Sequence, residues 1–339
     1  MRAAVYKGNR RIEVEEVETP RPGLGQILMR IKYAGICGSD VHRFQFGMLR
    51  AGVVLGHEYS GTIAALGEGV TGWQVGDRIV GGGGVAPGGQ PARSTSSPRY
   101  TAKQAGFNPA ITYGGFAEFI CLDAWRPLKT PDEVPDEAAV LAEPCSVAVH
   151  AVRMSRLRVG DSVAILGAGP IGLLTQQVCR AAGARQILVS EPAPARRRAA
   201  TELGADLVLD PRSEDAVARF LEETGGLGPD VVFDCAGARG TLQQSLDMAR
   251  RGGQAVVVSL NWEPDQVMPV DWVGREVNLQ ATYGSLPEDW RISLHLMGRG
   301  DVRHGPMVSE AGIIPLEGTQ AAFESLIRPG DQVQVVVAP

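Results

Sequence analysis

The chain has 339 residues, of which 44% are hydrophobic and 21% are charged, and its formal net charge is −5. The length exceeds what one hydrophobic core usually holds, so we expect two domains. The slightly acidic balance gives no support to nucleic-acid binding. No apolar run reaches the roughly 18 residues needed to span a bilayer, and the charged N-terminus does not resemble a signal peptide.

Cysteine usage indicates the compartment. The five cysteines are odd in number, widely spaced and never in a C-x-x-C pair: Cys37, Cys121, Cys145, Cys179 and Cys235. This pattern is typical of a reducing environment, in which isolated cysteines are usually buried. We therefore expect a cytoplasmic protein.

Up to about residue 130 the sequence predicts short strands and loops. Alternating apolar residues indicate strands at 27–35, 59–67 and 77–82, and the pattern resumes at 116–122. Residues 81–113 are rich in glycine, serine and proline and predict a long loop. We expect above-average disorder around 86–108.

From about residue 160 short apolar runs alternate with helical segments. The runs begin with SVAIL (162–166) and QILVS (186–190) and continue through ADLVLD, PDVVFDCAG and QAVVVSL. Strands that alternate with helices of about 10–15 residues predict a parallel, doubly wound sheet. A strand at 277–284, a helix at 287–299 and a closing strand, VQVVV, follow. The predicted fold class is α/β, with a β-rich domain beside a Rossmann-type domain.

The first βα turn of this region reads GAGPIG, from Gly167 to Gly172. G-x-G-x-x-G between a strand and a helix is typical of dinucleotide binding: Gly167 permits the tight turn, Gly169 lets the pyrophosphate approach, and Gly172 allows close helix packing. Nineteen residues after Gly172, Glu191 can accept both ribose hydroxyls of NAD and would repel the 2′-phosphate of NADP. We therefore expect NAD rather than NADP, although Arg196 and Arg197 offer positive charge for a phosphate. The predicted cofactor-binding residues of this turn are Gly167, Gly169, Pro170, Ile171 and Gly172.

Three stretches carry side chains that bind zinc. GICGSDVH (35–42) offers Cys37, GHEYSG (56–61) offers His57 and Glu58, and AEPCSVAVH (142–150) offers several candidates. Sulfur, imidazole and carboxylate together form a set that zinc accepts.

These motifs resemble those of the zinc-containing medium-chain alcohol dehydrogenases. The zinc signature of that family matches Gly56, His57, Glu58, Gly61, Gly67 and Val70 at the family's spacing. The resemblance covers nearly the whole chain and is closest to the sorbitol, butanediol and threonine dehydrogenase branch. It implies a GroES-like catalytic domain over 1–150, completed by 290–339, and a dinucleotide-binding domain over 151–289.

The resemblance also implies a catalytic zinc site. Cys37 and His57 match zinc ligands, and Glu58 matches an adjacent carboxylate that is bound directly or lies close by. The third ligand of sorbitol-type members is the glutamate of E-P-x-S-V, which corresponds to Glu143. Proline suits the first position of a helix, so we expect the helix to begin at Pro144, with Glu143 just outside it. Cys145 and the absence of a direct protein ligand are the alternatives. His150 lies about 10 Å further along a helix, too far for the same ion.

Proton transfer is implied for the segment after Cys37. Ser39 and His42 match the family's relay, and Asp40 matches a carboxylate that orients the zinc-bound imidazole. Val147, one helical turn after Glu143, is expected at the cofactor. A substrate alcohol bound to zinc as the alkoxide would pass hydride to NAD.

The sequence is less specific about the substrate and the oligomeric state. We expect a secondary alcohol, polyol or vicinal diol, or the matching ketone, as the small-molecule substrate, and a homodimer or homotetramer without membrane or nucleic-acid partners. Candidate pocket aromatics are Phe44, Phe46, Tyr113, Trp262 and Trp290. Residues 81–113 contain no cysteine, so we expect one catalytic zinc ion and no structural zinc.

Two alternatives remain. One is a zinc-free quinone or enone reductase of the medium-chain type, and the other is a non-catalytic NAD-binding protein on the same fold. The candidate zinc ligands argue against the first and the complete relay against the second.

Overall fold

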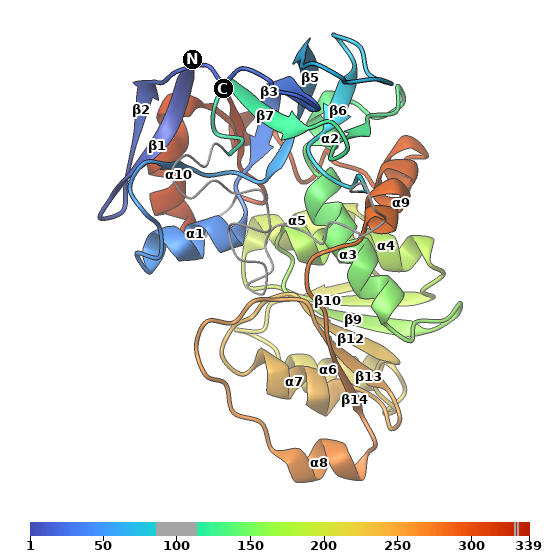
Figure 1. Ribbon diagram of the computed structural model, residues 1–339. Coiled ribbons are helices and arrows are strands. Elements are labelled where there is room, and N and C mark those ends of the chain that lie inside the picture. The colour runs from blue at the N-terminus through green and yellow to red at the C-terminus, as the bar shows by residue number, and fades with distance from the viewer. Residues whose placement is uncertain (86–113, 329, 331) are drawn as a thin grey trace. The chain divides into compact units, whose positions relative to one another are not determined.

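The computed structural model describes residues 1–85, 114–328, 330 and 332–339 (Figure 1). The chain divides into two compact units. The first unit consists of residues 1–146, 284–299 and 308–339, and the second consists of residues 147–283 and 300–307. The segment 86–108, for which disorder is expected, lies outside the described residues.

Two sheets build the first unit. A three-stranded sheet has the order β2-β1-β4, and a seven-stranded sheet has the order β15-β16-β3-β5-β6-β8, with β7 also paired to β3. The strands are β1 (Arg2–Gly8), β2 (Arg11–Glu16), β3 (Gln26–Gly35), β4 (Val53–Val54), β5 (Glu58–Leu66), β6 (Arg78–Val80), β7 (Phe119–Asp123), β8 (Leu128–Lys129), β15 (Ile313–Pro315) and β16 (Val336–Ala338).

Short helices complete the first unit. They are α1 (Gly38–Gln45), α2 (Asp136–Ala139), α9 (Pro287–Gly298), α10 (Thr319–Leu326) and the 3₁₀ turns η1 (Glu310–Gly312) and η2 (Leu316–Gly318), while α3 (Ala142–Met154) runs on into the second unit. The ring centroid of Phe323 on α10 lies 5.2 Å from that of Phe44 and 5.9 Å from that of Phe116. All three rings are buried, so the C-terminal segment is part of the core built by the N-terminal strands.

The register around β3 brings distant segments together. Gly35, the last residue of β3, pairs with Glu58 on β5 and with Val336 on β16. The strand order therefore places the C-terminal strand beside the segment that carries Cys37.

A six-stranded parallel sheet forms the second unit, in the order β11-β10-β9-β12-β13-β14. Its strands are β9 (Ser162–Leu166), β10 (Gln186–Ser190), β11 (Leu207–Leu209), β12 (Val231–Asp234), β13 (Gln254–Val257) and β14 (Asn278–Ala281). Its helices are α4 (Pro170–Ala181), α5 (Pro194–Glu202), α6 (Ala216–Glu223), α7 (Thr241–Met248) and α8 (Pro269–Gly274). The strand order reverses at β9, next to the GAGPIG turn, which is where such sheets bind ligands.

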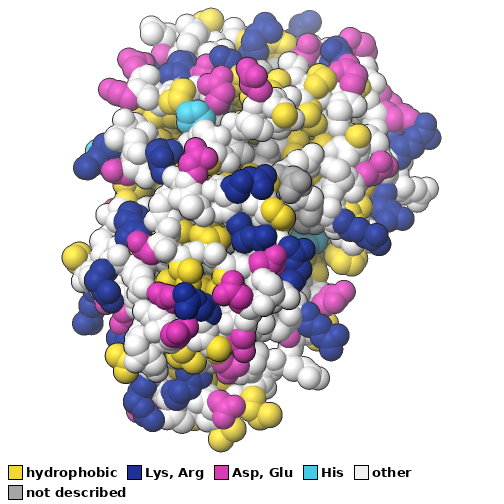
Figure 2. Space-filling model, turned by 180° about the vertical axis from the view of Figure 1, so that it is seen from behind, with side chains coloured by type: hydrophobic (Ala, Val, Ile, Leu, Met, Phe, Trp, Pro, Cys, Tyr) yellow, Lys and Arg dark blue, Asp and Glu magenta, His cyan; other side chains and the backbone are white. Residues whose placement is uncertain are grey.

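Charges of both signs are interspersed over the described residues on the face seen in Figure 2, where no continuous basic patch is present. This agrees with the net charge of −5. Among the described residues no helix combines the length and the apolar character needed to cross a bilayer.

Candidate functional site

Cys37, His57 and Glu58 are positioned by the ends of β3 and β5. Cys37 follows β3 in an extended conformation and immediately precedes α1. Gly56 precedes His57 with a φ of +94°, and a Cβ at Gly56 would lie 3.0 Å from the ring of Phe116. Glycine is therefore required at this turn, which directs the chain from the core into the start of β5.

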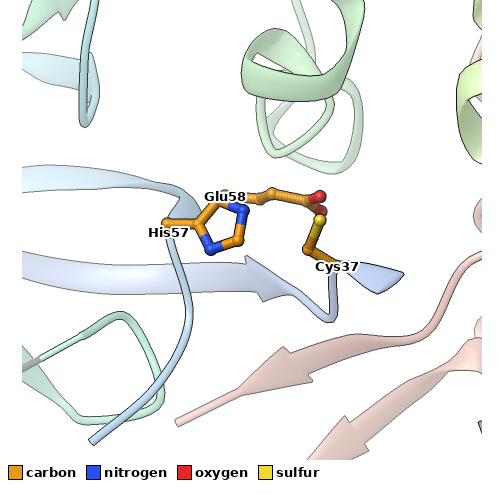
Figure 3. Close-up of side chains that lie close together, drawn as sticks. All are labelled: Cys37, His57 and Glu58. Carbon is orange, nitrogen blue, oxygen red and sulfur yellow. The ribbon is translucent and has the colours of Figure 1, made fainter. Parts of the chain in front are cut away.

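The ligand atoms of these three residues form a compact group. The thiol of Cys37, a ring nitrogen of His57 and a carboxylate oxygen of Glu58 all lie within 4.8 Å of one another. Figure 3 shows the carboxylate of Glu58 directed towards the sulfur of Cys37, with the His57 ring beside them. Glu58 is buried, whereas Cys37 and His57 are partly exposed. The sequence motifs thus meet in space although they are about 20 residues apart.

The carboxylate of Asp40 faces the ring of His57. Its Oδ2 lies 3.3 Å from Nδ1 of His57, and Asp40 is buried. When Nδ1–H faces this carboxylate, Nε2 is the nitrogen left for a metal. This is the arrangement in which a carboxylate sets the tautomer of a metal-binding histidine.

The group carries an excess of negative charge. Burial lowers the pKa of His57, but the charges of Asp40 and Cys37 outweigh it and raise that pKa well above its usual value. Burial, and next the charge of Cys37, raises the pKa of Glu58 well above its usual value. Within the described part of the chain, no lysine or arginine forms an ion pair with Asp40 or Glu58. Buried carboxylates that lack a lysine or arginine partner are costly to ionise, so a divalent cation fits this donor set, and sulfur, imidazole and carboxylate are donors that zinc accepts.

Glu143 lies in the first turn of α3 and not outside the helix. The prediction that the helix begins at Pro144 was wrong by two residues, since α3 starts at Ala142. Glu143 is buried, and burial raises the pKa of its carboxyl group to about 7. The charges of Glu58 and Asp40 also raise this pKa, whereas the charge of His57 lowers it. These electrostatic interactions place Glu143 in the neighbourhood of the group, although its carboxylate is not among the atoms that lie within 4.8 Å of one another.

The two other candidate zinc ligands on α3, Cys145 and His150, have surroundings that differ from those of Glu143. Cys145 is fully buried, and burial raises the pKa of its thiol to about 12. Because metals bind the thiolate, such a thiol is a poor ligand. His150 lies seven residues after Glu143 on the same helix and is half-buried.

Ser39 and His42 both belong to α1. The Ser39 hydroxyl donates to Sγ of Cys37 over 3.3 Å, so it lies at the metal group. The His42 ring stacks on Phe46 with 6.3 Å between ring centroids, and burial lowers the pKa of His42. A lowered pKa keeps the imidazole neutral at neutral pH, in the form that accepts a proton.

One residue near the group was not predicted from the sequence. The amide Nε2 of Gln334 donates to Oε2 of Glu58 over 3.1 Å, and both side chains are buried. The sequence gives one indication of this residue, because Gln334 is a single polar residue between Val333 and Val335 in the apolar closing segment.

The glycine turn of the second unit has the expected local structure. Gly167 follows β9 with a φ of +89°, and a Cβ there would lie 2.9 Å from Cα of Ala236. A Cβ at Gly172 would clash with the carbonyl oxygen of Gly167, whereas a Cβ at Gly169 meets only Nη1 of Arg196 at 3.7 Å. α4 begins at Pro170, with Ile171 in its first turn. The turn therefore leaves open space only at Gly169, where a bound pyrophosphate would approach.

Glu191 follows β10 and lies beside the turn. Its carboxylate accepts hydrogen bonds of 2.7 Å from the backbone amides of Ala168 and Ala193. Arg197 donates to the carbonyl oxygens of Glu191 and Pro192. It also lies 3.0 Å from Asp210. Arg197 is therefore held by protein groups, and Glu191 is fixed at the turn.

The remaining predicted residues occupy varied positions. Val147 is half-buried on α3. Phe44 belongs to the core, and Trp290 packs where a Cβ at Gly82 or Gly83 would be. Phe46 and Trp262 are exposed, and Tyr113 lies outside the described residues.

Comparison with known proteins bears on this geometry. Residues 23–132 match the alcohol dehydrogenase GroES-like domain, and residues 170–299 match the zinc-binding dehydrogenase domain. The chain is 34% identical to (R,R)-butanediol dehydrogenase of Bacillus subtilis, with all of both chains covered. It is 32% identical to human sorbitol dehydrogenase, with 95% of this chain and 91% of the relative covered.

Solved structures of related proteins share the fold of this chain. The crystal structure of 2R,3R-butanediol dehydrogenase from Bacillus subtilis superposes with a TM-score of 0.86 at 32% identity, covering 100% of this chain and 99% of that one. A protein of Sinorhizobium meliloti 1021 described as a zinc-binding dehydrogenase, bound to NADP, gives a TM-score of 0.84 at 29% identity, covering 100% and 99%. With its GroES-like and Rossmann-type units and the group of Cys37, His57 and Glu58, this chain belongs to the zinc-containing medium-chain alcohol dehydrogenase family.

Proposed function

We propose that this protein is a zinc-dependent dehydrogenase that exchanges hydride between NAD(H) and a secondary alcohol, polyol or vicinal diol. The observation that carries the proposal is the compact group of Cys37, His57 and Glu58, with no lysine or arginine paired to the buried carboxylate of Glu58 in the described part of the chain. A zinc-free reductase would not need such a group. A non-catalytic NAD-binding protein would not need a hydroxyl and an imidazole beside it.

Cys37, His57 and Glu143 would hold the zinc ion, with Glu58 as a further carboxylate that binds directly or lies close by. Zinc bound there supplies a Lewis acid, which acidifies an alcohol or polarises a ketone. Asp40 orients the imidazole of His57. Its contact of 3.3 Å with Nδ1 supports this role.

Ser39 and His42 would move the alcohol proton. The Ser39 hydroxyl lies at the metal group through its hydrogen bond to Cys37, and His42 is three residues on along α1, on the same side of the helix. The lowered pKa of His42 favours the neutral imidazole, which can accept a proton from Ser39 during oxidation and return it during reduction.

The cofactor is proposed to be NAD rather than NADP. The turn at Gly167, Gly169 and Gly172 would receive the pyrophosphate, with Pro170, Ile171 and Val147 as further contacts. Glu191 is held next to this turn, where a carboxylate favours ribose hydroxyls over a phosphate. The engagement of Arg197 by Asp210 and by two carbonyl groups argues in the same direction.

We further propose a homodimer or homotetramer in the cytoplasm. β14 is an edge strand of its sheet, and it follows α8, which exposes Val270 and Val273. Figure 2 shows hydrophobic side chains at the lower end of the molecule, where Figure 1 places α8. An unpaired strand edge beside exposed apolar residues is suited to pairing with a second copy.

One experiment tests the enzyme class and the cofactor together. The purified protein is assayed for zinc content and for NADH or NADPH formation with secondary alcohols, vicinal diols and polyols. We expect bound zinc, and faster turnover with NAD than with NADP. Protein that turns over fully after complete removal of zinc would contradict the proposed mechanism.

A further inference from the structure

The contact between Gln334 and Glu58 crosses a strand that has no side chain at that point. Gly35 pairs with Glu58 on one side and with Val336 on the other, so β5, β3 and β16 lie in sequence across the sheet. A Cβ at Gly35 would lie 2.8 Å from Nε2 of Gln334 and even closer to Oε2 of Glu58. The Glu58 carboxylate therefore occupies the space that glycine leaves empty and reaches the C-terminal segment.

The backbone fixes the position of the donor. Ile36 donates its N–H to the carbonyl of Val335 over 3.0 Å, which extends the β3–β16 pairing to the residue after Gln334. Gln334 is only 4% exposed, and its amide donates to Glu58 over 3.1 Å. Gln334 directly precedes this pairing, so its buried side chain has little freedom to move away from its partner.

From this geometry we infer that Gln334 is a positioning residue, which holds the Glu58 carboxylate at the metal group through the gap at Gly35. Gln334 is neutral, so it restrains Glu58 without cancelling its charge. The C-terminal segment would thereby contribute to the metal site through a residue 276 positions away from Glu58 in sequence. The inference rests on the proposed zinc site.

The test compares zinc affinity, measured by competition with a chromophoric chelator, in the wild type and in Gln334→Met. Methionine keeps the approximate volume but removes the donor. Loss of a partner that orients a metal ligand typically weakens metal binding about 10- to 100-fold, and we expect a loss in this range. The visible spectrum of the cobalt-substituted protein should change as well, because the carboxylate is no longer held.

The control is Gln254→Met in the second unit. Gln254 is also buried at 4% exposure, and its side-chain Oε1 accepts a hydrogen bond of 2.7 Å from the backbone amide of Arg156. We expect this variant to lose stability without losing zinc affinity. If Gln334→Met is too unstable to purify, Gln334→Asn, which keeps the amide but shortens the reach, should show the same direction of change.

A double-mutant cycle distinguishes positioning from a general structural role. In a Glu58→Ala background, Gln334→Met should cause no further loss of zinc affinity, because its partner is already absent. An unchanged zinc affinity in Gln334→Met, or an equal loss in both backgrounds, would overturn the inference. Absence of zinc binding in the wild type would instead overturn the proposed function.

Discussion

At the scale of single residues, short motifs identified candidate ligands that the structure places close together. GHE and GICGSD contain sulfur, imidazole and carboxylate beside glycine turns, and the structure brings Cys37, His57 and Glu58 together. Gln334 could not be predicted in this way, because its contact depends on the register of β16 against β3. Such long-range pairing leaves no local pattern beyond one polar residue in an apolar run.

Glu143 and Cys145 offer the sharpest test at this scale. Glu143 interacts electrostatically with His57, whereas the buried Cys145 thiol has a pKa raised to about 12. Glu143→Ala should lower zinc affinity and turnover by about 10-fold or more, and Cys145→Ala should leave both unchanged apart from a stability loss of roughly 1 kcal/mol. Zinc content and kcat/KM of the two purified variants check this. Reversed results would reassign the ligand to Cys145.

The raised pKa of Glu143 predicts a pH dependence in the zinc-free protein. Its folded pKa is about 7, against an ordinary value of 4.5. Between these values the folded state keeps a proton that the unfolded state has lost, so this group's contribution to stability is present below 4.5 and declines as pH rises to about 7. In Glu143→Gln that decline should be absent. Urea unfolding of both chelator-treated proteins from about pH 5 to about pH 8 measures the difference, and parallel curves would contradict the prediction.

At the scale of elements, periodicity located most strands and the helices between them, because burial on one face imposes a regular apolar pattern. Helix ends were less well determined. Pro144 was expected to start α3, but the helix begins two residues earlier, at Ala142. Proline is tolerated anywhere in the first turn, where backbone N–H groups have no helical partner, so it does not fix the first residue.

Two glycines of the GAGPIG turn have different predicted roles, one in cofactor binding and one in packing. Gly169 has a φ of −68°, and a Cβ there would meet only Arg196, so Gly169→Ala should fold normally. This variant should bind NADH more weakly, because the added methyl group would occupy the space through which the pyrophosphate approaches the turn. A Cβ at Gly172 would clash with the Gly167 carbonyl, so Gly172→Ala should lose about 1–3 kcal/mol of stability. Thermal unfolding without cofactor and NADH fluorescence titration measure the two effects. Equal loss of stability in both variants would refute this division.

At the scale of the whole molecule, the change from β-rich to alternating sequence indicated two units, but the return of the chain was inferred only from family resemblance. Residues 284–299 and 308–339 belong to the first unit, with Phe323 in its core. Composition cannot reveal this, because the packing of Phe323 on Phe44 and Phe116 joins residues that are hundreds of positions apart.

Assembly is the property of the whole molecule that the exposed edge of β14 predicts. The N–H groups of Asn278 and Thr282 bond to β13, so those of Leu279 and Ala281 face away from the sheet. Ala281→Pro removes one outward donor, and Val273→Asp places a charge on α8, where Val273 is 59% exposed. Both variants should shift the proposed oligomer towards monomer in sedimentation velocity. Val75→Asp, in the first unit at 62% exposure, should not. A wild type that sediments as a monomer, or dissociation caused equally by Val75→Asp, would show that assembly does not use this edge.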